Sequence, residues 1–150
     1  MGVAEDNREA ARELDPSSTT ILVVDDLEQI RELVRSELEA AGYNVLQAHN
    51  GAAALLAAMN YVGRIDLLLT DVQMPGMNGR ELAKWTRAQC PGISVLYMTG
   101  DPGDVFGQQE VEDSRESFLN KPFDRQTLLL KVRNALSRPI AGSGQSSNEA

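Results

Sequence analysis

The chain has 150 residues, of which 42% are hydrophobic and 24% are charged, and this composition suits one globular domain with a sizeable core. Its formal net charge of -8 argues against a nucleic-acid surface, because such a surface concentrates basic side chains against phosphates. The single cysteine, Cys90, excludes an intrachain disulfide, and no Cys/His cluster predicts a zinc site.

The first 18 residues are expected to form a flexible leader, because they are charged and Ala-rich and end in the turn signal "DPSS". They lack the apolar core of a signal peptide, and no long uncharged apolar span follows, so we expect a cytoplasmic protein without membrane contact. The β-branched run "TTILVVDD" then predicts a strand that ends at Asp25 and Asp26. Apolar residues at helical spacing predict an amphipathic helix over 27–41, which Gly42 ends.

The middle of the chain repeats this alternation. The segment "YNVLQA" predicts a second strand over 43–48, and Asn50 is placed to cap a helix over 51–60. The apolar run "IDLLLT" predicts a third strand, over 65–70, of the kind that is buried in a parallel sheet covered on both faces. Asp71 follows directly, at the carboxyl end of this strand.

The last third continues the same pattern. Helix formers predict a helix over 79–88, and "ISVLYMT" predicts a fourth strand that ends at Thr99. A weak helical stretch follows over 105–112, then a fifth strand at "SFLN", a turn at "KPF" and a final helix capped by Asp124. The small polar residues of 139–150 predict a disordered tail, so one domain over 19–138 is expected.

Five strands alternating with five helices predict an α/β fold with a doubly wound parallel sheet in three layers, because parallel neighbours need right-handed crossover connections. The carboxyl ends of parallel strands meet at one edge of the sheet. This edge is therefore expected to gather the polar residues that follow the strands, namely Asp25, Asp26, Asp71, Thr99 and Lys121.

Three crowded carboxylates repel one another unless a cation neutralises them, and their oxygens suit Mg²⁺, which also accepts phosphate oxygens. Thr99 can donate a hydrogen bond and Lys121 supplies a positive charge for the same phosphate oxygens. The reaction that fits is transfer of a phosphoryl group onto a carboxylate nucleophile. No Gly-rich loop of the GxGxxG or GxxxxGK[ST] type predicts a bound nucleotide cofactor.

Each of these side chains has a simpler interpretation when it is taken alone. Asp25 or Asp26 would cap the helix that begins after them. Thr99 would be a turn hydroxyl, Lys121 a solvated charge and Phe118 a core residue. Their joint occurrence, in order, at successive strand ends favours the functional interpretation.

The segments "ILVVDD", "DLLLTDVQMPGMNGRELA", "VLYMTG" and "FLNKPF" closely resemble the receiver domain of two-component response regulators, over roughly residues 20–136. The resemblance includes every strand end in order. It implies a flavodoxin-like fold of the chemotaxis-receiver type, with strand order 2-1-3-4-5. It also implies a signalling module that catalyses only its own phosphorylation and dephosphorylation, rather than an enzyme.

The resemblance implies a role for each polar residue. Asp71 would be the phosphoacceptor and Lys121 would pair with it before phosphorylation. Asp26 would bind Mg²⁺ directly and Asp25 largely through water, and the backbone carbonyl of Gln73 would complete the protein ligands.

The resemblance further implies a conformational switch. Thr99 would move toward the phosphoryl group, and Phe118 would be the switch aromatic, three residues before Lys121. Phosphorylation would then shift a pre-existing arrangement of the last strand and its neighbouring helices. The Lys121–Pro122 bond is cis in the family.

The partners implied are a histidine kinase or a histidine phosphotransfer protein as donor, and a downstream protein as target. A phosphorylation-dependent dimer is also compatible with the resemblance, whereas nucleic acid and membrane are not expected partners. A stand-alone protein is favoured because the chain begins with Met, and the alternative is a receiver segment of a hybrid histidine kinase.

Two other classes stay open. A hydrolase with an aspartyl-phosphate intermediate would carry a second Asp two residues after the nucleophile, where this chain has Gln73. A receiver-like interaction module that never takes phosphate would be expected to have lost an Asp, the Thr or the Lys, and none is lost.

Overall fold

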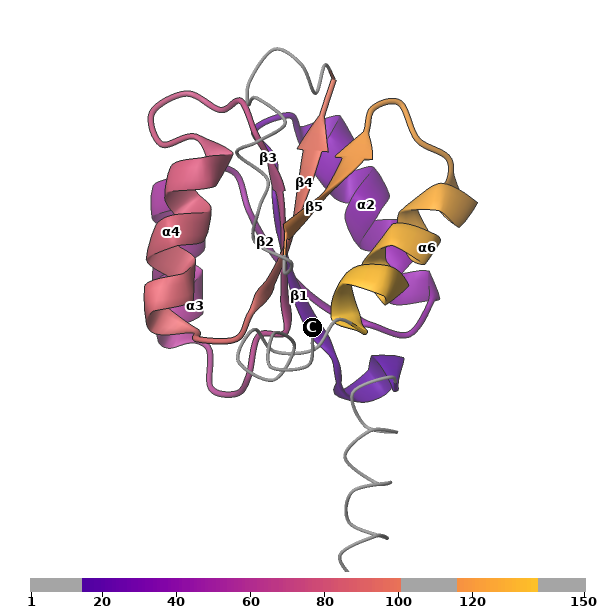
Figure 1. Ribbon diagram of the computed structural model, residues 1–150, viewed down its shortest axis with the longest axis horizontal. Helices are drawn as coiled ribbons and strands as arrows, with labels where there is room; N and C mark the ends of the chain where they lie inside the picture. Colours follow the sequence, from indigo (N-terminus) through magenta and orange to yellow (C-terminus); the bar gives the residue numbers. More distant parts are fainter. Residues whose placement is uncertain (1–14, 101–115, 138–150) are drawn as a thin grey trace, which may run out of the picture.

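The computed structural model describes residues 15–100 and 116–137, and it confirms the predicted doubly wound α/β architecture. One parallel sheet has the strand order β2-β1-β3-β4-β5 (Figure 1). Its strands are β1 (Thr20–Val24), β2 (Asn44–Ala48), β3 (Leu67–Asp71), β4 (Ser94–Thr99) and β5 (Glu116–Asn120). The described helices are the short 3-10 turn η1 (Pro16–Ser18), α2 (Glu28–Ala40), α3 (Gly51–Asn60), α4 (Gly79–Gln89) and α6 (Arg125–Leu136).

Parts of three sequence predictions lie outside the described residues. These are the first 14 residues of the predicted leader, the weak helix at 105–112 and the tail from 139. The last part of the leader is described, and it forms η1, in which Asp15 accepts a hydrogen bond from the Ser17 N–H at 3.0 Å.

The sheet is the central layer, with α3 and α4 on one face and α2 and α6 on the other (Figure 1). Successive residues of a strand point to opposite faces, so each strand contributes to both cores. Leu22 and Leu68 pack on the side of α3 and α4, whereas Ile21 and Leu69 pack on the side of α2 and α6. Every residue of β1, β3 and β4 is buried, as expected for inner strands of a covered parallel sheet.

The predicted helix caps are confirmed. Asn50 accepts the N–H of Ala53 at 2.7 Å, and Asp124 accepts the N–H of Thr127 at 2.8 Å. These bonds satisfy backbone donors that have no partner inside the first turn of a helix.

The third strand starts two residues later than the apolar run suggested, and it includes Asp71. Ile65 is buried, but the carboxylate of Asp66 accepts the backbone N–H of Thr20 at 2.9 Å, and regular pairing with β1 begins at Leu67. The strand extends to Asp71 because this residue lies opposite Met98 in β4. The backbone of Asp71 is thereby held by the sheet itself.

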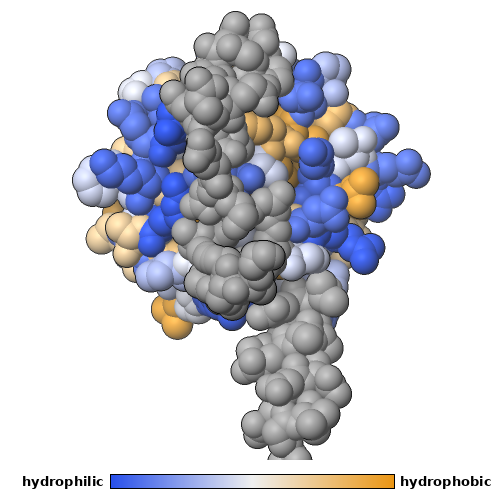
Figure 2. Space-filling view, viewed as in Figure 1, coloured by the Kyte–Doolittle hydropathy of each residue, from blue (hydrophilic) through white to orange (hydrophobic). Residues whose placement is uncertain are grey.

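The described surface in the view of Figure 2 carries mostly hydrophilic side chains. Large apolar side chains are exposed singly on α2 (Leu33), α4 (Trp85) and α6 (Leu130), and α3 exposes two, Leu56 and Met59. Exposed apolar residues that are scattered singly are ordinary on a protein surface. Over residues 15–100 and 116–137, the helices are too short or too polar to cross a membrane.

Candidate functional site

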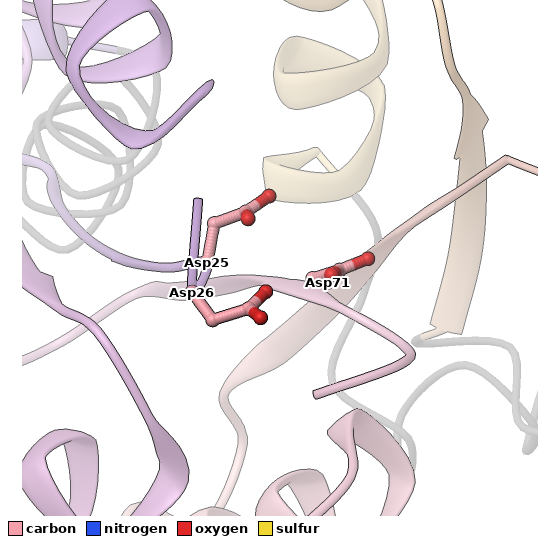
Figure 3. A group of neighbouring side chains, drawn as sticks. All are labelled: Asp25, Asp26 and Asp71. Carbon is pink, nitrogen blue, oxygen red and sulfur yellow. The ribbon is translucent and has the colours of Figure 1, made fainter. Parts of the chain in front are cut away.

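Three carboxylates lie together at the carboxyl edge of the sheet (Figure 3). Asp25 and Asp26 follow β1 directly, and Asp71 is the last residue of the neighbouring strand β3. One carboxylate oxygen from each of the three residues lies within 4.8 Å of the oxygens from the other two. The parallel topology therefore produces the acidic cluster that the strand ends predicted.

Asp25 and Asp26 differ sharply in their surroundings. Asp25 is fully buried, and its Oδ1 accepts the backbone N–H of Leu27 at 2.9 Å, whereas Asp26 is exposed. The hydrogen bond of Asp25 thus reaches the residue before the first turn of α2 rather than an N–H group inside that turn, so Asp25 does not cap the helix as its simpler interpretation expected. The residue at the N-cap position of α2 is Leu27, which makes no side-chain capping bond.

Lys121 joins the two buried carboxylates. Its Nζ lies 3.3 Å from Asp25 Oδ2 and 3.3 Å from Asp71 Oδ1. The backbone N–H of Lys121 donates to the carbonyl of Thr99 at 2.8 Å, which continues the pairing of β4 with β5 and turns the lysine toward the cluster. The bond from Lys121 to Pro122 is cis.

The remaining predicted site residues lie on β4, on β5 and in the loop after β3. Thr99 is buried at the end of β4, and Gln73 is exposed in the loop after β3. Phe118 of β5 is half-buried, and its ring lies against Tyr97 with centroids 5.5 Å apart. The contact between these two rings is a feature that the sequence did not indicate.

The environment of Asp71 disfavours its charged form. Burial raises the pKa of the Asp71 carboxyl above its ordinary value, and the charges of Asp25 and Asp26 add to this rise. The ammonium group of Lys121 opposes the rise, but it does not cancel it. The folded protein therefore holds a proton on Asp71 at a higher pH than the unfolded chain does.

This shift predicts how Asp71→Asn changes stability in the absence of divalent metal. Because the folded-state pKa is raised, the ionised carboxylate costs stability above that pKa, and the cost disappears once the pH falls below the ordinary pKa of aspartate, about 4. We expect the Asn variant to be more stable than the wild type at neutral pH, with a difference that shrinks on acidification. Urea unfolding in EDTA across this pH range measures it.

Asp124 offers a control of the opposite sign. Hydrogen bonds from Thr127 hold the pKa of the Asp124 carboxyl below its ordinary value, so its contribution to stability is lost as the pH falls. Asp124→Asn is therefore expected to show no gain at neutral pH. Equal pH profiles for the two variants would contradict the assignment of the raised pKa to Asp71.

Two contacts that fix the backbone of the site were not predicted. Arg31 of α2 donates from its guanidinium to the carbonyl of Asp25 at 2.8 Å. The hydroxyl of Thr70 donates to the carbonyl of Asp71 at 2.9 Å. The sequence held no signal for either bond, because both depend on how a helix or a peptide group is turned.

The donor set fits a hard divalent cation. All three clustered side chains offer carboxylate oxygens, the ligand type that Mg²⁺ prefers, and one of the three is open to solvent. The cluster also has a cation on its buried side, Lys121. A site of this kind can bind a divalent metal and attract the oxygens of a phosphoryl group.

The family described as response regulator receiver domain matches residues 21–133. Among curated proteins, the chain is 38% identical over 124 residues to the transcriptional regulatory protein FixJ of Azorhizobium caulinodans, covering 82% of this chain and 57% of FixJ. The chain spans about half, or less, of the length of several other curated relatives.

Solved structures give the same result. The receiver domain of the hybrid histidine kinase CckA matches with a TM-score of 0.67 and 35% identity, over 78% of this chain and 98% of that chain. The chemotaxis response regulator CheY4 of Vibrio cholerae matches with a TM-score of 0.67 and 32% identity, over the same shares of the two chains.

Proposed function

The chain belongs to the response regulator receiver domain family, and we propose that it takes a phosphoryl group onto Asp71 from a histidine kinase or a histidine phosphotransfer protein. Two-component receivers work with histidine kinases in general. The choice of Asp71 as acceptor, and of the residues that assist it, is the proposal.

The observation that carries the proposal is the place of Lys121. Its Nζ lies 3.3 Å from Asp71 Oδ1, at the edge of a cluster of three carboxylates. A lysine in this position is a point charge that can follow phosphate oxygens once they arrive. The same lysine also neutralises part of the negative charge of Asp25 and Asp71, the two buried carboxylates that it reaches.

The chemical step is a displacement at phosphorus. A carboxylate oxygen of Asp71 attacks, a P–O bond forms, and the P–N bond to the donor imidazole breaks. The imidazole keeps the electron pair of the broken bond and takes up a proton. Lys121 stabilises the charge on the transferred oxygens, and Thr99 donates its hydroxyl hydrogen to one of them.

The carboxylates of Asp25, Asp26 and Asp71, with the carbonyl of Gln73, are proposed to hold Mg²⁺. The ion supplies positive charge against the carboxylates and the phosphoryl oxygens. Within the protein, the Leu27 N–H and the Arg31 guanidinium hold the side chain and the carbonyl of Asp25 in place. Asp26 is the exposed carboxylate of the three, so its side chain faces solvent.

Phosphorylation is proposed to switch a protein-binding surface through Thr99 and Phe118. Thr99 ends β4 opposite Asn120, and Phe118 lies two residues earlier in the same strand β5, opposite Tyr97. A shift of Thr99 would therefore reach Phe118 through the pairing of β4 with β5. A ligand can only shift populations by binding one state better, and the phosphoryl group would do so through Thr99 and Lys121. The surface that phosphorylation exposes would bind a downstream protein or a second copy of the chain.

The test is incubation with Mg²⁺ and acetyl phosphate, followed by intact mass measurement. We expect a single phosphoryl adduct in the wild type, and none when EDTA replaces Mg²⁺, because the carboxylates then repel the incoming phosphate. The same measurement with a phosphorylated histidine phosphotransfer protein tests the proposed donor. No adduct with any donor in the presence of Mg²⁺ would favour an interaction module that never takes phosphate.

A further inference from the structure

We infer that Gly79 is a positioning residue for Asp71, because helix α4 begins directly against the peptide group of the acceptor residue. The inference rests on the proposed function, in which Asp71 takes the phosphoryl group. Gly79 has no side chain, so its role cannot come from a side-chain contact with the carboxylate cluster or with Lys121.

The contact is between backbone and backbone. A Cβ atom built on Gly79 would overlap the carbonyl oxygen of Asp71, and it would lie 3.0 Å from the Cα of Val72. The N–H of Gly79 donates to the carbonyl of Val72 at 2.8 Å. No rotamer change can relieve such an overlap, because the atoms in the way belong to the main chain.

The same peptide group is held from two other directions. The buried hydroxyl of Thr70 donates to the carbonyl of Asp71 at 2.9 Å, and the N–H of Val72 donates to the carbonyl of Met98 at 3.1 Å. The Asp71–Val72 peptide therefore lies between β4 on one side and the start of α4 on another. Any side chain at position 79 must displace either the helix or this peptide.

A displacement here would reach the reacting group. The side chain of Asp71 is attached to a Cα next to the displaced peptide group. Its Oδ1 lies 3.3 Å from Lys121 Nζ and its carboxylate lies close to those of Asp25 and Asp26, so a shift of the backbone would change these distances. Residues that orient metal ligands without binding the metal are sensitive positions, and their loss weakens metal affinity. Gly79 is thus expected to set the geometry of the site by leaving room for it.

The experiment compares Gly79→Ala with Gly100→Ala. A Cβ built on Gly100 meets no described atom within 4 Å, so this control adds the same methyl group without the overlap. Mn²⁺ alone is titrated into each protein and free Mn²⁺ is followed by electron paramagnetic resonance. We expect Gly79→Ala to weaken Mn²⁺ binding about tenfold, and Gly100→Ala to leave it unchanged.

A second readout needs no metal. In the metal-free protein, the backbone amide resonances of Asp71 and Val72 are expected to shift in Gly79→Ala and to stay in place in Gly100→Ala. If the wild type binds no Mn²⁺ and takes no phosphate, the proposed function fails, while these amide shifts still test the positioning role. Wild-type Mn²⁺ affinity together with unshifted amides in a folded Gly79→Ala protein would overturn the inference.

Thr70→Val keeps the inference testable should Gly79→Ala fail to fold. It removes the hydroxyl that holds the same carbonyl and adds no volume that could overlap the main chain. We expect Mn²⁺ binding to weaken about threefold, as for the loss of one hydrogen bond. Unchanged Mn²⁺ affinity and unchanged amide resonances of Asp71 in this variant would count against positioning through the Asp71 peptide.

Discussion

Asp71→Asn is expected to abolish the phosphoryl adduct completely, whichever donor is used. The amide of Asn is uncharged and is a far weaker nucleophile than a carboxylate, so no atom of the Asn side chain can replace the attacking carboxylate oxygen. The variant keeps the shape of the side chain, and its fold is expected to persist because the strand pairing of Asp71 runs through the backbone. Intact mass after incubation with Mg²⁺ and acetyl phosphate measures the result.

Asp124→Asn serves as the matched control for this loss. Asp124 is an exposed carboxylate that caps α6, and its removal should leave the adduct at the wild-type level. An adduct that survives Asp71→Asn would show that another side chain accepts the phosphoryl group. Peptide mapping of the adduct would then name the residue.

Lys121→Ala is expected to slow adduct formation by about 100-fold, the order found when one preorganised donor to a transition-state oxyanion is removed. Its Nζ is within 3.3 Å of Asp71, so its charge acts where negative charge develops on the transferred oxygens. The initial rate of adduct formation at saturating Mg²⁺ measures the effect.

The same variant should bind divalent metal more tightly than the wild type does. Lys121 neutralises Asp25 and Asp71 in the metal-free protein, and a metal that binds these carboxylates competes with it. The titration with Mn²⁺ separates this gain from the loss of rate. Lys84→Ala, which removes an exposed lysine of α4, is the charge-matched control for both measurements. A wild-type rate in Lys121→Ala would remove Lys121 from the proposed step.

The fold was predictable because its elements have strong local signals. The strands β1, β3 and β4 are short apolar runs, and their burial on both faces matches that composition. Asn50 and Asp124 are good N-cap residues, and both cap the helices expected of them. The limits of β3 were less predictable, because the side chain of Asp66 bonds the backbone of β1 before the regular ladder begins.

The candidate site was predictable to the level of which residues meet. Parallel strands end at one edge, so a polar residue after each strand has to lie near the others. Asp25, Asp26 and Asp71 were therefore predicted to meet, and one oxygen from each carboxylate lies within 4.8 Å of the others. The sequence did not separate the buried Asp25 from the exposed Asp26, since neighbours in sequence at a strand end turn to different surroundings.

Local periodicity and chain connectivity were enough to predict the alternation of elements, the parallel sheet and the polar residues at its edge. The packed fold was needed to find that the ammonium of Lys121 lies equally close to Asp25 and Asp71, and that α4 starts against the peptide of Asp71. Both are contacts between segments far apart in the chain. Their distances depend on how whole elements pack, which no local pattern encodes.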